Sequence, residues 1–448
     1  MRVEKTDHIV LGLRNDWGQE VPFALSVADR RHHLLAVGKS GVGKSTLLFN
    51  MVMQDIEAGR GVGVIDPHGD LVEDILAHIP KHRVEDVVYF DPADTEFPVS
   101  LNLLAGVRED RRDEVIDGII AAFKGTWAEF FGPRMESLFR NALASLYYCQ
   151  NASLLGVERI LTDERYRAWV LKQVKDPKVR AYWPRQYDVH DRKTQAEHAS
   201  PILNKIDAFL LPQGIRNVVG QVRKSVDARF MMDSGRIFLA NLSKGRLGPD
   251  RAALLGSLWV TQFQVAAMSR ADTPREERRD FFLYVDEWQS CLTNAFVSVL
   301  SECRKYRLCL TLANQYFGQI DQKILDAVFG NVSSLVAFRV GHDDAEVLER
   351  AFGGTYVAKQ FASLSNAEVI VKLLRDGREL DPFFGRTLAP RGTRRGHGDK
   401  IIARSRQKYA EPRERAERRI ERWFGLPLVQ RKTRKKPGRR KGRSGPDV

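Results

Sequence analysis

The stretch Gly38-Lys39-Ser40-Gly41-Val42-Gly43-Lys44-Ser45-Thr46 fits the pattern G-x-x-x-x-G-K-[ST] of a phosphate-binding P-loop. Its glycines allow a tight turn that brings backbone N–H groups onto phosphates. Lys44 can reach the β- and γ-phosphates, and the Ser45 hydroxyl can hold Mg²⁺. An apolar strand pattern at 33–37 precedes the loop, and an apolar helix pattern at 47–53 follows it. This context favours a nucleotide site over a glycine-rich turn with an exposed lysine.

The composition indicates a protein with a sizeable core and no membrane span. The chain has 448 residues, 43% of them hydrophobic, which suggests two or three domains. No apolar run approaches the roughly 20 residues that cross a bilayer, and the first residues lack the apolar core of a signal peptide. The four cysteines form no CxxC pair, as expected in a reducing compartment. We therefore expect a cytoplasmic protein.

The positive charge is concentrated at the C-terminus. Residues 391–448 hold 21 Lys and Arg against 6 Asp and Glu, whereas the whole chain carries a net charge of +14. Nine of the thirteen residues in 431–443 are basic. Such a segment is expected to be disordered and to bind phosphate backbones without sequence preference, although a solubility tail would look the same. A short charged helix is predicted over Arg413–Phe424.

Acidic residues follow a second apolar strand pattern at Gly61–Ile65. Asp66 and Asp70 come directly after it, at the end of a strand where open α/β sheets bind ligands. Asp66 is thus a further candidate near the metal. The ordinary alternative for both residues is turn and helix-cap chemistry, with Asp70 capping the next helix.

A mostly helical pattern occupies residues 108–230. Basic residues alternate there with aromatic ones, which suits single-stranded nucleic acid. An ordinary helical surface with aromatic core residues is the favoured interpretation. The alternating residues are Trp169, Arg180, Tyr182, Trp183, Arg185, Tyr187, Arg192 and Lys193.

The strand pattern Phe281–Val285 ends in Asp286 and Glu287, the form of a Walker B motif. Asp286 would hold Mg²⁺ through water, and Glu287 would polarise the attacking water. Two acids after a strand are common by chance. Their position downstream of a P-loop makes a capping pair the weaker explanation.

Two polar residues near the next strand pattern, Leu308–Gln315, are further candidates. Gln315 stands where a sensor could bond the γ-phosphate or the water. Arg304 precedes this strand, where it could reach a neighbouring subunit and stabilise the transferred phosphoryl group. For Arg304 alone, a solvated helix charge would be the better explanation.

The ordered set of motifs resembles the ATPases of the HerA/FtsK group, and within it the TraG/TraD-like coupling proteins of conjugative type IV secretion. The resemblance covers roughly residues 5–390. It is carried by the P-loop and by Ile65–Asp70, Gly132–Glu136, Leu242–Gly245, Tyr284–Glu287, Arg304–Tyr306 and Ala313–Gln315.

This resemblance implies a RecA-like α/β fold: a parallel sheet with an inserted all-α domain. It also implies a homo-oligomer, a hexameric ring that uses ATP and Mg²⁺ to move DNA through its pore. The position matching Arg304 serves there as an arginine finger, and the position matching Gln315 as a sensor. The N-terminal transmembrane helices of membrane-bound coupling proteins are missing here. We therefore expect no membrane anchor and, at most, a place peripheral to an inner-membrane secretion complex.

We accordingly expect an ATPase core from residues 1–107 and 231–390, a mostly helical insertion at 108–230, and a basic, disordered linker and tail at 391–448. Lys44, Ser45, Asp286 and Glu287 would carry hydrolysis, with Gln315 and Arg304 assisting. The leading hypothesis is an ATP-driven DNA translocase. Two alternatives stay open: an ATPase for protein export or remodelling, and a non-motor DNA-binding protein that uses ATP as a switch.

Overall fold

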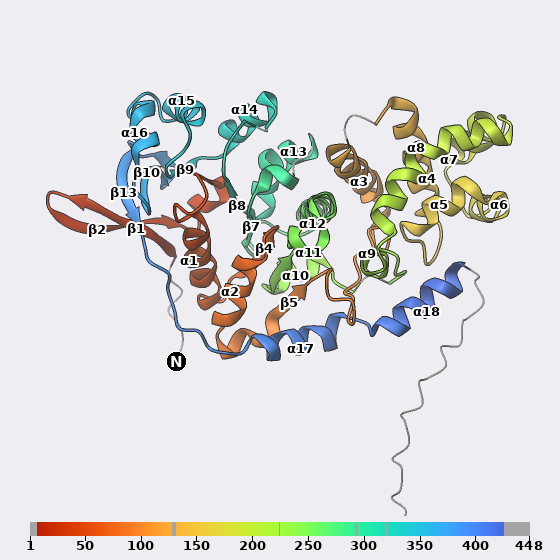
Figure 1. Ribbon diagram of the computed structural model, residues 1–448, viewed down its shortest axis with the longest axis horizontal. Coiled ribbons are helices and arrows are strands. Elements are labelled where there is room, and N and C mark those ends of the chain that lie inside the picture. The colour runs from red at the N-terminus through yellow and green to blue at the C-terminus, as the bar shows by residue number, and fades with distance from the viewer. Residues whose placement is uncertain (1–6, 128–130, 224, 292–293, 319, 425–448) are drawn as a thin grey trace, which may run out of the picture.

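One large mixed sheet, covered by helices on both faces, organises the molecule (Figure 1). The computed structural model describes residues 7–127, 131–223, 225–291, 294–318 and 320–424. Within these ranges the sheet has eleven strands in the order β2-β1-β13-β10-β9-β3-β8-β7-β4-β6-β5. The strands are β1 (His8–Asp16), β2 (Gln19–Ser26), β3 (Leu34–Val37), β4 (Gly61–Asp66), β5 (Val87–Phe90), β6 (Ile237–Asn241), β7 (Phe281–Val285), β8 (Leu308–Asn314), β9 (Ser334–Ala337), β10 (Glu368–Lys372) and β13 (Phe383–Thr387).

Seven neighbouring strands, from β9 to β5 in that order, run parallel. Every residue of β3, β4, β6, β7 and β8 is buried, as in parallel sheets that are covered on both faces. The strands predicted from continuous apolar runs are therefore core strands. Strand β8 lies between β3, which leads into the P-loop, and β7. The carboxyl ends of these three strands meet at one edge of the sheet, where such folds bind ligands.

On the antiparallel side of the sheet, strands from the N-terminal part of the chain pair with strands from its C-terminal part. The N-terminal strands β1 and β2 pair with each other and form an edge of the sheet. They reach the parallel strands only through β13 and β10. Neither β10 nor β13 was singled out by a sequence pattern, because each is short and β13 pairs with β1 from the opposite end of the chain.

Helices α1 (Lys44–Glu57) and α2 (Asp70–His78) pack on one face of the sheet, and α12 (Pro249–Ser269) and α13 (Asn294–Glu302) pack on the other. On the second face, Phe90 and Phe238 of the sheet meet Trp259 of α12 at ring-centroid distances of 5.2 and 4.4 Å. Smaller helices connect the later strands. They are α11 (Lys244–Leu247), α14 (Gln322–Asn331), α15 (His342–Ala351) and α16 (Ala358–Ser363).

The chain between β5 and β6 is helical, and no strand occurs among its described residues. Its apolar core is continuous with the core on the α12 face of the sheet. Trp183 and Tyr187 are buried. Trp183 donates a hydrogen bond of 2.9 Å to Ser145 Oγ, and Tyr187 donates one of 2.9 Å to Leu161 O. These two aromatics are therefore core residues, as the favoured interpretation held, whereas Trp169 is 49% exposed. The helices are α3 (Arg112–Thr126), α4 (Pro133–Leu146), α5 (Leu155–Thr162), α6 (Glu164–Leu171), α7 (Pro177–Tyr182), α8 (Arg192–Leu210), α9 (Gln213–Val219) and α10 (Ala228–Ser234).

The C-terminal segment differs from the expected disordered tail over much of its length. It forms α17 (Gly398–Tyr409) and α18 (Arg413–Phe424), the second with the predicted bounds. Both helices run along the lower edge of the molecule in Figure 1, from α2 to the helical region. Helix α18 is held there by Trp423, whose ring meets Tyr166 at 5.9 Å and whose carbonyl accepts a 2.8 Å hydrogen bond from Arg159. The basic run 431–443 lies outside the described residues, and its disorder stays a prediction.

Helix α17 was missed because its apolar signal is slight. Only Ile401 and Ser405 are buried in it, among many charged residues. Ser405 Oγ accepts a 2.8 Å hydrogen bond from the backbone of Tyr89 in β5. A helix this polar is stabilised by the surface onto which it docks, which a local pattern does not show.

Candidate nucleotide-binding site

The P-loop joins β3 to α1 in a conformation that depends on its glycines. Gly41 and Gly43 have φ angles of 76° and 117°, in the left-handed region that favours glycine. A Cβ on Gly38 would lie 2.5 Å from Cβ of Phe338. The loop is also tied to the neighbouring strands, because Gly38 N–H donates to Asn314 O (3.2 Å) and Lys39 N–H donates to Arg339 O (2.8 Å). The turn that the motif requires is therefore present at the predicted place.

Lys44 is buried against its own loop. Its Nζ donates hydrogen bonds to Gly38 O (2.5 Å) and Lys39 O (2.9 Å). Burial lowers the pKa of the ammonium group, while the nearby carboxylates of Glu287 and Asp286 act in the opposite direction. The loop thus holds the lysine beside the acids, within the cavity that the P-loop lines.

Asp286 lies close to two other carboxylates. It follows β7, and its backbone N–H donates to Ile65 O of β4 over 3.1 Å. Burial, then the charges of Asp66 and Glu287, raise the pKa of Asp286 to about 6. Bringing a cation to this carboxylate would relieve the repulsion.

Asp66 and Asp70 both line the cavity, and Asp66 also has the helix-capping role that was an alternative for both residues. The carboxylate of Asp66 accepts the N–H groups of His68 (2.8 Å) and Val72 (3.1 Å), so Asp66 holds the start of α2. Helix α2 has Gly69 as its N-cap and no side-chain cap bond from Asp70. Asp70 instead lines the cavity. The alternative in which Asp70 caps α2 is therefore wrong, and Asp66 does so while it also lines the cavity.

Glu287 is held in an unusual backbone conformation. Its φ is 45°, in a region that non-glycine residues rarely adopt and that costs on the order of 1–3 kcal/mol. Gln289 Nε2 donates a hydrogen bond to Glu287 Oε2. Ser290 donates to the Glu287 carbonyl through both its N–H (2.9 Å) and its Oγ (2.8 Å). Backbone and side chain of the predicted base are therefore both constrained, as is typical of residues placed for chemistry.

The donor set fits Mg²⁺ bound together with phosphates. Ser45 and Asp286 line one cavity, with the carboxylate of Asp66 close behind. Among the described residues, no three His, Cys, Asp or Glu side chains are arranged to hold a metal by themselves. Mg²⁺ in nucleotide sites has few protein ligands, because phosphates and water supply the rest.

One cavity of about 680 Å³ collects most of the predicted site residues. Gln315, just after β8, lies in it as predicted. Its predicted members are Ser40, Gly41, Gly43, Lys44, Ser45, Thr46, Asp66, Asp286, Glu287 and Gln315.

Arg304 is not in this cavity. It belongs to the 3-10 turn η8 (Cys303–Tyr306), which precedes β8 and so lies at the opposite edge of the sheet. There it lines a second cavity of about 810 Å³ with Arg275 and Arg278. Burial, then the charge of Arg275, lowers the pKa of Arg304. Arg304 therefore does not face the P-loop of its own chain, and its role in a neighbouring subunit stays a prediction.

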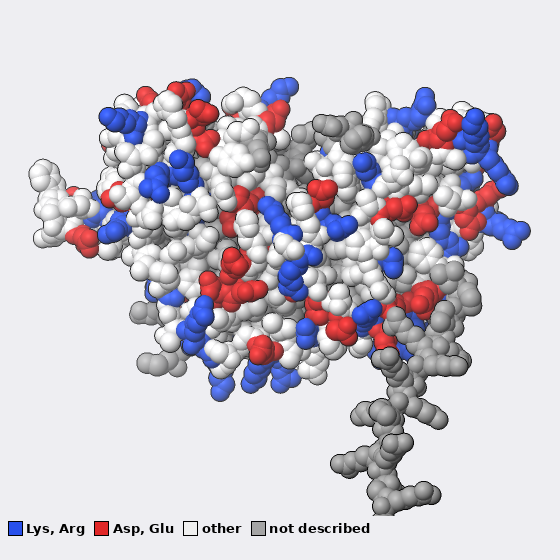
Figure 2. Space-filling view, viewed as in Figure 1, with Lys and Arg blue, Asp and Glu red and all other residues white. Residues whose placement is uncertain are grey.

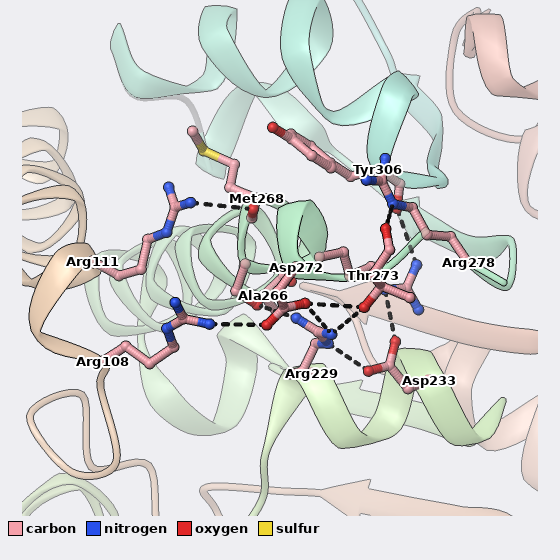
Figure 3. A network of polar contacts seen from close by, with 12 residues as sticks. Arg108, Arg111, Arg229, Asp233, Ala266, Met268, Asp272, Thr273, Arg278 and Tyr306 are labelled. Atoms are coloured by element: carbon pink, nitrogen blue, oxygen red, sulfur yellow. Dashed lines mark hydrogen bonds and ion pairs between the residues drawn. The ribbon is translucent and has the colours of Figure 1, made fainter. Parts of the chain in front are cut away.

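The turn that carries Arg304 is anchored by other arginines. Arg278 donates to Lys305 O (2.7 Å) and packs on the Tyr306 ring, and Arg270 donates to Tyr306 O (3.0 Å). Figure 3 shows Arg278 and Tyr306 beside a polar network in which Asp272 accepts from Arg108 and Arg229 over 2.9 Å each. This network joins the turn to α10 and to the start of the helical region.

Phe49, His78 and Arg394 are among the side chains of the cavity that were not predicted. Phe49 and His78 look like ordinary apolar and terminal positions of helices. Arg394 is separated from the P-loop by most of the chain. No local signal marks any of them, since only folding brings them together.

The sheet and the loop between β3 and α1 define a RecA-like P-loop fold. Among solved structures, the conjugative coupling protein TrwB is similar in its unbound form (14% identity, 88% of this chain and 91% of that chain covered, TM-score 0.63). TrwB in complex with ADP and Mg²⁺ is also similar (16%, 88% and 92%, TM-score 0.64). VirB4 of Thermoanaerobacter pseudethanolicus matches at 12% identity over 85% of this chain and 96% of that one, with a TM-score of 0.57.

These likenesses show that the chain has the fold of these proteins, as the resemblance implied. No protein-family model matches the sequence, and no curated protein matches it. None of the described helices is both long and apolar enough to pass through a bilayer.

Proposed function

We propose that this chain hydrolyses ATP as a motor subunit that moves DNA, in the manner of a type IV secretion coupling protein. The observation that carries the proposal is the gathering of Lys44, Asp286, Glu287 and Gln315 around one P-loop cavity. In this proposal the loop and Lys44 bind the phosphates. Ser45 and Asp286 would hold Mg²⁺, which would supply charge stabilisation at the transferred phosphoryl group. Glu287, directed by Gln289, would orient and deprotonate the attacking water.

The position of Arg304 supports assembly into a ring. Arg304 lies at the edge of the sheet opposite the P-loop, in a cavity with other basic residues. A residue so placed reaches a phosphoryl group only on another subunit. We therefore propose a homo-oligomer, with a hexamer as the form that the resemblance implies.

DNA as the moved substrate is supported by similarity in fold and by charge. Figure 2 shows Lys and Arg side chains along the lower edge of the molecule, where α17 lies in Figure 1, and mixed charges over the rest of that face. Some of these charges are neutralised, since Glu85 pairs with Lys408 and Arg404, and Asp94 with Arg406. Residues 425–448 add nine Lys and Arg against one Asp.

The first experiment is ATP hydrolysis with and without single- and double-stranded DNA, at two salt concentrations. The chain ending at Phe424 is the right comparison with the full chain, because Pro390 and Arg394 line the site and α17 and α18 pack on the body. Removing 425–448 strips much of the non-specific attraction to phosphate, which falls steeply with salt. Stimulation by DNA that survives supports the motor. Basal turnover without stimulation would favour a protein-directed ATPase, and an absence of turnover would favour an ATP-dependent switch.

A further inference from the structure

The cavity at the P-loop extends well beyond the phosphate site. Asp70, Asp74 and His78 all line it, and they lie four residues apart along one side of α2. At 1.5 Å per residue, they span about 12 Å along the helix axis. The cavity therefore continues from the acids near the P-loop to the far end of α2.

Three separate segments meet at this far end. Phe49 comes from α1, His78 from α2, and Pro390 and Arg394 from the chain that follows β13. The rings of Phe49 and His78 are 4.9 Å apart and nearly perpendicular. Arg394 pairs with Asp74 over 3.1 Å, and Asp74 O is 2.7 Å from His78 Nδ1. The end wall is thus aromatic on the helix side and carries a proline ring and a guanidinium on the other side.

A buried asparagine fixes the course of the segment after β13. Asn50 is only 2% exposed, and its Nδ2 donates to Leu388 O (3.1 Å) and Ala389 O (3.0 Å). Its Oδ1 accepts from Arg391 N–H over 2.8 Å. Further along, Arg395 N–H donates to Ala77 O of α2 over 2.7 Å. Pro390 and Arg394 are therefore held at the cavity by bonds on either side of them.

The chemistry of this end suits a flat heterocycle. Aromatic rings, a proline ring and a guanidinium plane all offer flat faces for stacking. The Arg394 side chain is 76% exposed, and Asp74 is 54% exposed. Because an exposed ion pair contributes little, Arg394 can turn toward a ligand at small cost.

We propose that Phe49, His78, Pro390 and Arg394 form the subsite for the nucleobase of the bound nucleotide, with Arg394 stacking on the base. The inference rests on the proposed function only in requiring that the P-loop bind a nucleotide. It makes the C-terminal segment part of the nucleotide site. The subsite offers flat faces for stacking rather than hydrogen-bond partners for the edge of a base. It should therefore favour purines over pyrimidines, because the larger ring has more area in contact.

The test compares a ligand that has a base with one that lacks it. Calorimetric titration of the full chain with ADP and with inorganic pyrophosphate, both with Mg²⁺, separates the two ends of the cavity. Arg394→Ala should weaken ADP binding by about threefold to fivefold, the size of an exposed cation–π contact. Pyrophosphate affinity should not change. Arg394→Lys keeps the charge opposite Asp74 but loses the planar group that stacks on a base, so it should restore ADP affinity only in part.

Arg395→Ala is the matched control, because Arg395 contacts α2 through its backbone N–H, which the substitution leaves in place. It should bind both ligands as the wild type does. Unchanged ADP affinity in Arg394→Ala would overturn the subsite, and so would an equal loss for ADP and pyrophosphate. Hydrolysis in the wild type is a separate readout. An absence of hydrolysis in the wild type would contradict the proposed motor. An unchanged ADP affinity in Arg394→Ala would contradict only the base subsite.

Discussion

Glu287 and Arg304 lie at opposite edges of one sheet, although β7 and β8 next to them are parallel neighbours. Glu287 follows the carboxyl end of β7 and faces the P-loop cavity, whereas Arg304 precedes β8 and faces a different cavity. In the proposed function, a single chain would therefore supply the base of one site and the arginine of another. This arrangement makes cooperation between subunits directly testable.

Arg304→Ala should lower ATP turnover by about 1000-fold or more if Arg304 acts as an arginine finger. Lys44→Ala should be equally inactive through loss of phosphate binding. When the two variants are mixed in equal amounts and reassembled, some interfaces combine an intact Lys44 with an intact Arg304. Recovery of turnover in the mixture would establish action between subunits. If Arg304 served its own P-loop, no mixed assembly would regain activity.

Glu287→Gln should bind ATP but turn it over about 100-fold to 10,000-fold more slowly, because the amide cannot accept the proton of the attacking water. The measurement is steady-state hydrolysis beside nucleotide binding. Glu276→Gln is a suitable control, since Glu276 is exposed in the connection before β7. Turnover at the wild-type rate would remove Glu287 from the role of base.

Gln289→Leu should lower kcat by about tenfold to a hundredfold with little change in KM, because the Glu287 carboxylate loses the donor that directs it. Gln289 is not expected to touch the nucleotide, so ADP affinity should stay at the wild-type value. A change in KM without a change in kcat would show that Gln289 acts on substrate binding instead.

His33 should make stability depend on pH. Its ring is buried, Nδ1 accepts from Leu310 N–H (3.0 Å), and Nε2 lies 3.0 Å from Leu300 O. Only the neutral ring fits, and burial lowers the pKa of His33 to about 4. Between this value and the unfolded pKa of about 6.5, the unfolded chain binds one proton more. The free energy of unfolding is thus highest above this window and should fall by about 3 kcal/mol on acidification through it.

Urea unfolding at several pH values between 7.5 and 4.5 measures this slope. His33→Gln should be less stable at neutral pH but should show a shallower dependence on pH, by about one proton. His82→Gln, at an exposed position, should keep the wild-type slope. An unchanged slope in His33→Gln would mean that other groups cause the acid sensitivity.

Much of the candidate site was predictable because its signals are local. The left-handed turns of Gly41 and Gly43 are a requirement of the loop itself, and Lys44 is only one residue further on. The buried strand before Asp286 appears as an unbroken apolar run. Where the backbone must adopt one conformation, or a strand must be buried on both faces, the residue types reveal it.

Other features depend on contacts between distant parts of the chain. Asp66 rather than Asp70 holds the start of α2, because the loop geometry directs the Asp66 carboxylate at Val72 N–H. The antiparallel part of the sheet needs β13 to join β10 to β1, and the far wall of the cavity needs Arg394.

Chain order and local patterning thus account for the P-loop, the core strands and the pair of acids. Pairing across the sheet and docking of the C-terminal segment account for the rest of the cavity. The physical reason is the range of the interactions. Backbone conformation and burial periodicity act over a few residues and leave a mark in the sequence. Strand partners and docked helices are selected by the total free energy of a packed structure, which no single stretch encodes.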